Sequence, residues 1–216
     1  MHVANLGGFE PDEMAFATPR TFSSAIRFLE ENRTNEKPFY LYVNTFHSHE
    51  SWEAPRKYYE MCRDPSYKGP IYLTLPYNTL HKAPVPEAGL RDVQAHYSGL
   101  ITMVDTWFGR LLDKLRETGK DGNTLVIFVS DHGTNFGDNP ERVTGKPAGA
   151  LYPGTMHIPL IVRHPQRKGT GKRVREFAYT LDVPATVCAA AGVAPREGVQ
   201  GQDLLAAADG GFIRRD

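Results

Sequence analysis

A short apolar run, residues 125–129, ends abruptly at the polar sequence Ser130-Asp131-His132-Gly133. A continuous apolar run of this length is typical of a parallel strand that is covered on both faces. Open α/β sheets bind their ligands at the edge where such strands end. The sequence therefore predicts an α/β fold with a candidate site directly after residue 129.

Helical periodicity and further apolar runs alternate along the rest of the chain. Apolar residues recur at helical spacing in two segments, a third helix is indicated by the start sequence Asp182-Val183-Pro184 and the stop at Gly192, and three more segments are apolar enough to be strands. The expected helices span residues 21–32, 90–118 and 182–191, and the expected strands span residues 39–46, 158–162 and 177–181. Alternation of this kind predicts helical layers around a mostly parallel sheet.

Residues 50–89 lack a sustained period and are rich in Pro, Tyr and charged residues. They are expected to form a long loop with short helical turns at most. Its aromatic residues either stack on a sugar or an aryl ring or pack in the interior, and the sequence leaves both possibilities open. The aromatic residues concerned are Trp52, Tyr58, Tyr59 and Tyr72.

Charge and hydropathy exclude several classes of partner. Lys plus Arg and Asp plus Glu number 25 each, so the chain lacks the net charge that attracts nucleic acids or anionic membranes. No apolar run approaches the ~18 residues of a membrane span, and residues 1–8 lack the pattern of a signal peptide. We expect a soluble, unexported chain, cytoplasmic as it stands, with no nucleic-acid or membrane partner.

Asp131 and His132 form the first candidate pair. A carboxylate oxygen beside an imidazole nitrogen is a reasonable half of a divalent-metal site. Neighbouring side chains on a strand point to opposite faces, so the pair converges only if the chain leaves strand geometry, which Gly133 permits. The alternative is a plain turn with an exposed Asp and His.

Two histidines and a lysine are the other candidates. His47 and His49 share a face if the backbone stays extended, so they can bind a metal or donate a proton to a substrate. Lys146 follows a glycine in a loop, where its ammonium can contact an anionic oxygen. The alternatives are surface histidines in a loop and a solvated lysine.

In their order along the chain, these segments resemble the sulfatases of the alkaline-phosphatase superfamily. The resemblance is closest over residues 123–133. It also rests on residues 38–43, 47–52, 97–105, 109–112, 159–163, 181–186 and 201–204. It implies an alkaline-phosphatase-like fold, here a partial three-layer α/β/α sandwich with a mostly parallel mixed sheet. Residues 1–205 are expected to form part of the catalytic domain, and residues 206–216 a frayed tail.

The resemblance also implies a chemistry. In such sulfatases a divalent cation, usually calcium, orients the sulfate ester, and a hydrated formylglycine made from a cysteine attacks sulfur. By resemblance, Asp131 and His132 are metal ligands, Lys146 holds a sulfate oxygen and His49 assists departure of the alcohol. His47 is a further substrate-binding candidate. The family often has Asn at the position of His132, so manganese or zinc are alternatives to calcium.

The chain departs from the family pattern at the nucleophile. Neither Cys62 nor Cys188 stands in the Cys-x-Pro-x-Arg sequence from which formylglycine is made, and the paired N-terminal aspartates of the metal site have no counterpart. The resemblance therefore implies the latter part of a sulfatase catalytic domain, inactive alone. Its expected partners are a missing N-terminal half and a sulfate ester, either a small molecule or a sulfated glycan.

Two alternatives to this interpretation remain open. A phosphodiesterase or phosphonate monoester hydrolase of the same superfamily also uses an Asp-His pair. The chain can also be a non-catalytic remnant or binding subunit that folds only against a partner.

Overall fold

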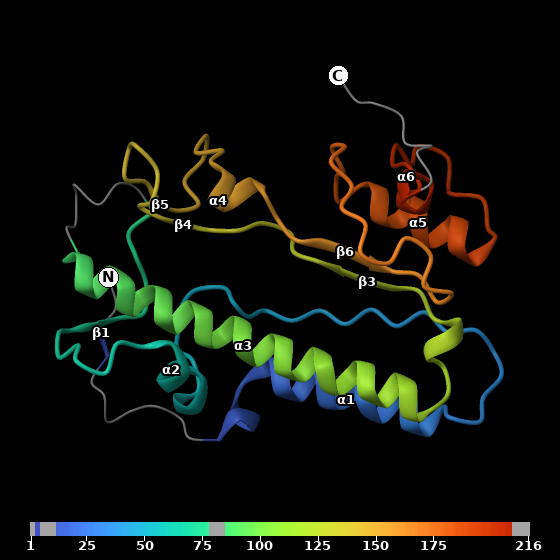
Figure 1. Cartoon of the computed structure of the whole chain (residues 1–216), viewed down its shortest axis with the longest axis horizontal. Helices are drawn as coiled ribbons and strands as arrows, with labels where there is room; N and C mark the ends of the chain where they lie inside the picture. The colour runs from blue at the N-terminus through green and yellow to red at the C-terminus, as the bar shows by residue number, and fades with distance from the viewer. Residues whose placement is uncertain (1–2, 5–11, 78–84, 209–216) are drawn as a thin grey trace. The chain divides into compact units, whose positions relative to one another are not determined.

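A computed structural model describes residues 3–4, 12–77 and 85–208 (Figure 1). The chain divides into two compact units, each described here by itself. The first comprises Met1–Gly119 and Thr134–Met156, and the second comprises Lys120–Gly133 and His157–Asp216. Residues 78–84 of the predicted loop lie outside the described residues.

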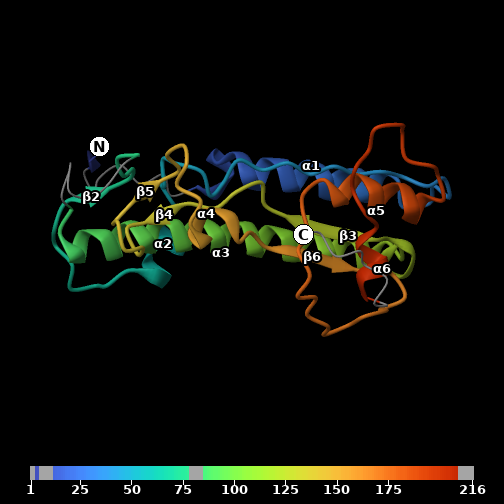
Figure 2. The same cartoon turned by 90° about the horizontal axis from the view of Figure 1, so that it is seen from above.

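Helices dominate the first unit. The long helix α3 (Glu87–Glu117) packs against α1 (Ala17–Glu31) and α2 (Arg56–Cys62), and Figures 1 and 2 both show α1 running alongside α3. This unit also contains η2 (Glu13–Ala15) and α4 (Pro153–Met156). Its strands form two antiparallel pairs, β1 (Val3–Ala4) with β2 (Ile71–Tyr72) and β4 (Asn135–Phe136) with β5 (Thr144–Gly145). The helices predicted from residues 21–32 and 90–118 are confirmed.

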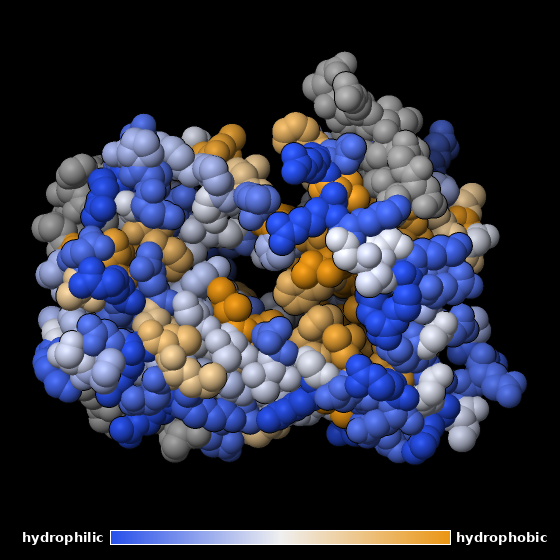
Figure 3. All heavy atoms as spheres, in the orientation of Figure 1, coloured by the Kyte–Doolittle hydropathy of each residue, from blue (hydrophilic) through white to orange (hydrophobic). Residues whose placement is uncertain are grey.

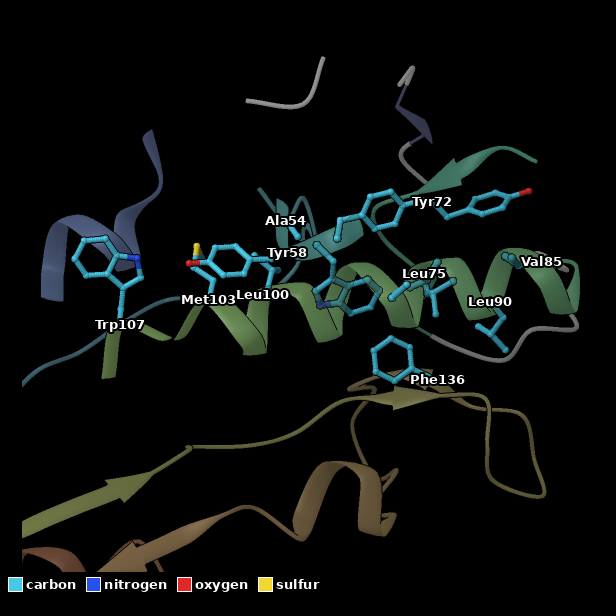
Figure 4. Close-up of a cluster of buried hydrophobic side chains, with 14 of the residues drawn as sticks. Ala54, Tyr58, Tyr72, Leu75, Val85, Leu90, Leu100, Met103, Trp107 and Phe136 are labelled. Carbon is cyan, nitrogen blue, oxygen red and sulfur yellow. The ribbon is translucent and has the colours of Figure 1, made fainter. Parts of the chain in front are cut away.

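The core of the first unit lies along α3 and is rich in aromatic side chains (Figure 4). Trp52 is fully buried, with its ring centroid 5.1 Å from that of Phe136, and its indole N–H donates to the carbonyl of Ser48 (3.1 Å). Burial of this kind leaves no ring face for a ligand. The aromatic residues of this segment therefore pack in the interior and do not stack on a ligand. The residues concerned are Trp52, Tyr58, Tyr59 and Tyr72.

The second unit contains a two-stranded ladder and two helices. β3 (Val126–Val129) pairs with β6 (Leu160–Arg163). The unit also holds η3 (Asp121–Asn123), α5 (Asp182–Ala191) and α6 (Leu204–Ala208). α5 ends at Gly192, whose φ of 67° suits glycine. Of the expected frayed tail, residues 206–208 belong to α6, and residues 209–216 lie outside the described residues.

The prediction of mostly parallel strand pairing is wrong for the described residues. All three ladders there are antiparallel pairs, and residues 177–181 form no strand. Residues 39–46 also form no strand, although their exposure alternates with the period of a strand. A strand needs a partner for its backbone N–H and C=O groups, and the described residues of the first unit offer none to this segment.

Apolar side chains are consequently left uncovered along residues 39–46. Tyr40, Tyr42 and Phe46 are 72%, 73% and 63% exposed and alternate with half-buried neighbours. Apolar residues also reach the visible surface elsewhere, as the hydrophobic patches in Figure 3 show. No helix in the described ranges combines the length and the apolar content needed to cross a membrane.

The buried His96 on α3 is expected to make the first unit sensitive to acid. Its ring is fully buried and stacks on Tyr59, with the centroids 3.9 Å apart. Burial lowers the pKa of His96 from 6.5 to about 4. Below pH 6.5 the unfolded chain binds a proton that the folded chain takes up only near pH 4. The folded state should therefore lose about 3 kcal/mol as the pH falls through this window.

Urea unfolding at several pH values between 7 and 4 measures this loss. The variant His96→Phe keeps a ring that can stack on Tyr59 but carries no titrating group, so its stability should fall less steeply over the same range. If the free energy of unfolding fell equally with pH in both chains, His96 would not contribute to the acid sensitivity.

Candidate functional site

The loop before Lys146 is held by hydrogen bonds of two buried polar side chains, Asn135 and Thr144. The buried side chain of Asn135 donates to the carbonyl of Gly145 (2.9 Å) and to the hydroxyl of Thr155 (2.6 Å). The hydroxyl of Thr144, also buried, donates to the carbonyl of Pro76. These bonds tie together segments far apart in sequence and hold the loop that presents Lys146.

Gly145 is required by both its conformation and its surroundings. Its φ is +69°, in the left-handed region that disfavours side chains. A Cβ atom at this position would lie 2.5 Å from Cδ1 of Tyr77. The absence of a side chain therefore lets the Tyr77 ring lie directly against the loop, next to Lys146.

Lys146 contacts both His49 and the adjacent Glu50. Its Nζ lies 2.8 Å from Oε2 of Glu50 and 3.2 Å from Nε2 of His49. The side chains of Lys146 and Glu50 are 14% and 7% exposed. Two of the residues singled out in the sequence, His49 and Lys146, are thus in direct contact although 97 positions apart.

The hydrogen bonds of His49 define which ring nitrogen carries the proton. Nδ1 lies 2.9 Å from the backbone carbonyl of Glu50, and a carbonyl only accepts, so Nδ1 is the donor. In the neutral ring Nε2 then has the lone pair, which accepts from the ammonium of Lys146. The Phe46 ring stacks on the imidazole at 4.6 Å and limits its rotation.

Lys146 and Glu50 keep each other charged. Burial alone would lower the pKa of Lys146, but hydrogen bonds to Glu50 and Tyr77 and the charge of Glu50 raise it above its usual value. Burial alone would raise the pKa of Glu50, but the hydrogen bond and the charge of Lys146, with its own backbone and Tyr77, lower it. The pair therefore holds one full positive and one full negative charge around neutral pH.

His47 faces another element. Its Nδ1 lies 2.8 Å from the hydroxyl of Thr18 on α1, and its ring lies 5.8 Å from that of Phe16. Burial lowers the pKa of His47. These contacts are with α1 and the residue before it and do not include Lys146, so the role of His47 in substrate binding stays a prediction.

In the second unit, Asp131 and His132 form a turn directly after β3. Oδ1 of Asp131 accepts the backbone N–H of His132 (2.9 Å), and the hydroxyl of Ser130 donates to the carbonyl of His132 (2.8 Å). Nδ1 of His132 lies 2.8 Å from the carbonyl of Gly133, which makes Nδ1 the donor. The chain thus leaves strand geometry at this point, as the sequence predicted.

The two side chains of this pair present compatible donor atoms. Nε2 of His132 lies 3.7 Å from Oδ2 of Asp131, and the two side chains are 40% and 87% exposed. Metal-binding histidines commonly donate their other ring N–H to a carbonyl, as His132 does. However, no group of three or more His, Cys, Asp or Glu residues that could hold a metal occurs within the described ranges. Metal binding by Asp131 and His132 therefore stays a prediction.

The predicted site residues lie in different units. His49, His47 and Lys146 belong to the first unit, and Asp131 and His132 belong to the second. Neither unit by itself contains all of these residues, so a single site in which they bind one ion and one anion remains a proposal. The sequence missed Glu50 and Tyr77, because their importance depends on contacts with a distant loop that no local pattern signals.

Comparison with known proteins identifies the family. The sequence model of the family described as Sulfatase matches residues 15–193, which is most of the chain. The chain belongs to the sulfatase family. It is therefore a member of the alkaline-phosphatase superfamily.

Curated relatives of this sulfatase chain are more than twice its length. An arylsulfatase of Clostridium perfringens is 28% identical over 94% of the chain and 43% of the relative. The multifunctional alkaline phosphatase superfamily protein PehA of Trinickia caryophylli is 28% identical over 87% of the chain and 41% of the relative. The chain thus spans less than half the length of these proteins.

Solved structures show the same fold. The phosphonate monoester hydrolase of Agrobacterium radiobacter superposes with a TM-score of 0.72 and 26% identity, covering 97% of the chain and 48% of that structure. The phosphonate monoester hydrolase SpPMH of Silicibacter pomeroyi superposes with a TM-score of 0.65 over 95% of the chain and 46% of that structure. The fold is alkaline-phosphatase-like and mixes helices with strands.

Proposed function

We propose that the chain forms the leaving-group and anion-binding part of a sulfatase that hydrolyses sulfate esters. The observation that supports this best is the contact between Lys146 and His49 in a chain of the sulfatase family. A sulfate ester carries its charge on equatorial oxygens and develops more on the leaving oxygen during displacement. A buried ammonium and an imidazole at one point can stabilise both.

The two side chains have different tasks in this proposal. Lys146 holds a sulfate oxygen by charge and hydrogen bond, which lowers the energy of the transition state. His49 presents Nε2, because Nδ1 is bound to a backbone carbonyl. When the anion takes over the hydrogen bond from Lys146, Nε2 is free to take up a proton from solvent, and the resulting imidazolium can donate that proton to the oxygen of the departing alcohol.

The metal in this proposal is held by Asp131 and His132. Oδ2 of Asp131 and Nε2 of His132 are the atoms that would bind it, and His132 is oriented for this by the carbonyl of Gly133. The ion would orient the ester and neutralise its charge. Calcium is the ion that the family resemblance favours, and the imidazole ligand also suits manganese or zinc.

A further segment is needed to complete the enzyme. We attribute the formylglycine and the paired aspartates to an N-terminal half, since neither Cys62 nor Cys188 stands in the required sequence. The exposed face at residues 39–46 supports this proposal, because a strand from such a segment would cover its apolar side chains and pair its backbone. With that segment, the chain would form the α/β/α sandwich of its family.

Sulfated compounds are the proposed substrates, either small sulfate esters or sulfated glycans. An endo-4-O-sulfatase of Bacteroides thetaiotaomicron is 30% identical over 62% of the chain. An ulvan-active sulfatase of Formosa agariphila is 27% identical over 82% of the chain. The names of both relatives support sulfated substrates. The likeness to phosphonate monoester hydrolases supports the alternative that the parent enzyme hydrolyses phosphonate monoesters or phosphodiesters.

Rates on matched aryl esters test the two activities. A sulfate ester offers three equatorial oxygens, whereas a phosphonate monoester offers two and a carbon substituent. A site with Lys146 and a metal arranged for three oxygens should therefore prefer the sulfate. In the enzyme completed with its N-terminal half, kcat/KM for 4-nitrophenyl sulfate should exceed that for a 4-nitrophenyl phosphonate about tenfold or more, the worth of one charged hydrogen bond. The reverse preference would favour the alternative.

A further inference from the structure

Glu50 contacts both Lys146 and His49, although the sequence did not mark it as a candidate site residue. Its Oε2 lies 2.8 Å from Nζ of Lys146 and 3.2 Å from Nδ1 of His49. Its side chain is only 7% exposed. One carboxylate oxygen thus contacts both residues that the proposed function uses.

The second oxygen of Glu50 makes no hydrogen bond within the described ranges that would stabilise the charge of the carboxylate. Oε1 is buried and has no hydrogen-bond partner among the described residues. A buried carboxylate costs free energy unless it is paired, so the contact with the ammonium is what stabilises its charge. Conversely, the side chain of Lys146 is 14% exposed, and because burial disfavours its charged form, a nearby anion stabilises the ammonium.

We propose that Glu50 is a positioning residue that stabilises the ammonium of Lys146 and holds it beside Nε2 of His49. A lysine side chain has a long flexible stem, and two hydrogen bonds from its ammonium restrict it to one place. A sulfate group would then meet a charged group already in position. This inference rests on the proposed function, because it assumes that Lys146 binds the sulfate group.

The charge of Lys146 can be measured without any enzymatic activity. An amine-reactive reagent modifies only unprotonated lysine, so the pH at half-maximal labelling reports the pKa of Lys146, whatever its accessibility. The titratable groups around the ammonium are Glu50, His49 and Tyr77. Mass spectrometry of the labelled 216-residue chain resolves Lys146 from the other lysines.

Glu50→Gln keeps the size of the side chain and removes its charge, so burial of Lys146 should then dominate. We expect the labelling midpoint of Lys146 to fall by about one pH unit or more, which is a tenfold rise in the unprotonated fraction at a fixed pH below the midpoint. Glu50→Asp keeps the charge and should stay close to the unchanged chain. Glu36→Gln makes the same substitution at an exposed position and should have no effect.

An unchanged midpoint in Glu50→Gln would overturn the proposal, and so would an equal fall in Glu50→Asp. A second readout separates it from the proposed function. Inorganic sulfate should protect Lys146 from labelling, and the protection should be lost at lower pH in Glu50→Gln than in the unchanged chain. If the midpoint moves but sulfate never protects Lys146, the coupling to Glu50 stands and the anion-binding role of Lys146 is contradicted.

Discussion

Aryl sulfate hydrolysis is expected only when the chain is combined with a segment that supplies the formylglycine and the paired aspartates. Alone, the 216-residue chain should release no measurable 4-nitrophenol from 4-nitrophenyl sulfate. Lys146 and His49 can stabilise charge and transfer a proton, but no serine, threonine or cysteine of the chain stands in a recognisable activated context. Stabilising groups without an attacking atom do not produce turnover.

The complementing segment is best taken from a sulfatase that is similar to this chain and expressed together with it. Residues 39–46 offer an uncovered edge for docking, and their exposed aromatic residues make aggregation the main risk of the experiment. The control is the same segment with the formylglycine cysteine replaced by alanine, which should dock without restoring activity. Sulfatase activity of the isolated chain, abolished by metal removal, would contradict the proposal and require another nucleophile.

If no complementing segment restores activity, the result would favour the interpretation that the chain is a non-catalytic remnant or binding subunit. A non-catalytic remnant would bind partners through residues 39–46 without completing an active site. Docking is measurable by analytical ultracentrifugation independently of activity. Docking of the segment with an intact formylglycine but no turnover would thus support a remnant, and docking with turnover would exclude it.

Local sequence patterns predicted the helices well because helical hydrogen bonds form within one segment. α3 was expected at residues 90–118 and spans Glu87–Glu117. α1 begins at Ala17, earlier than expected, and includes Pro19 in its first turn, where proline loses no hydrogen bond. The apolar stripe on each helix was visible in the sequence because it follows a short period.

Strand pairing could not be predicted in the same way. A strand is half of a hydrogen-bonded unit, and its apolar run does not specify the partner or its direction. The apolar run at residues 125–129 predicts a parallel strand, yet β3 pairs antiparallel with β6. The pattern of residues 39–46 predicts a mostly buried strand, but the segment forms no strand and the side chains of Tyr40, Tyr42 and Phe46 are exposed, so the prediction is wrong about both the element and its burial.

The candidate site was predicted in part. His49 and Lys146 were each weak candidates from their neighbours alone, and the order of motifs along the chain connected them. The sequence did not single out Glu50, because an acidic residue next to a histidine in a loop is common and predicts no particular role. Its contact with Lys146 spans 96 positions and follows from the fold of the loop around Gly145.

Replacing Lys146 with alanine in the completed enzyme is expected to lower kcat about a hundredfold. Removing one preorganised group that stabilises a developing charge typically costs on the order of a hundredfold to a thousandfold. The loss should be larger in kcat than in KM, because the ammonium acts on charge that grows in the transition state. Lys37→Ala removes an exposed lysine and should leave both constants unchanged.

Asp131→Ala should cause a loss of similar size through a different route. If Asp131 holds the metal, its removal weakens ion binding, so higher calcium concentrations should restore part of the activity. The same additions should not rescue Lys146→Ala, because its metal ligands are intact. Asp105→Ala, at an exposed position of α3, provides the control for removal of a carboxylate. If Asp131→Ala retained full activity at limiting calcium, Asp131 would not be a metal ligand, and the turn after β3 would be structural only.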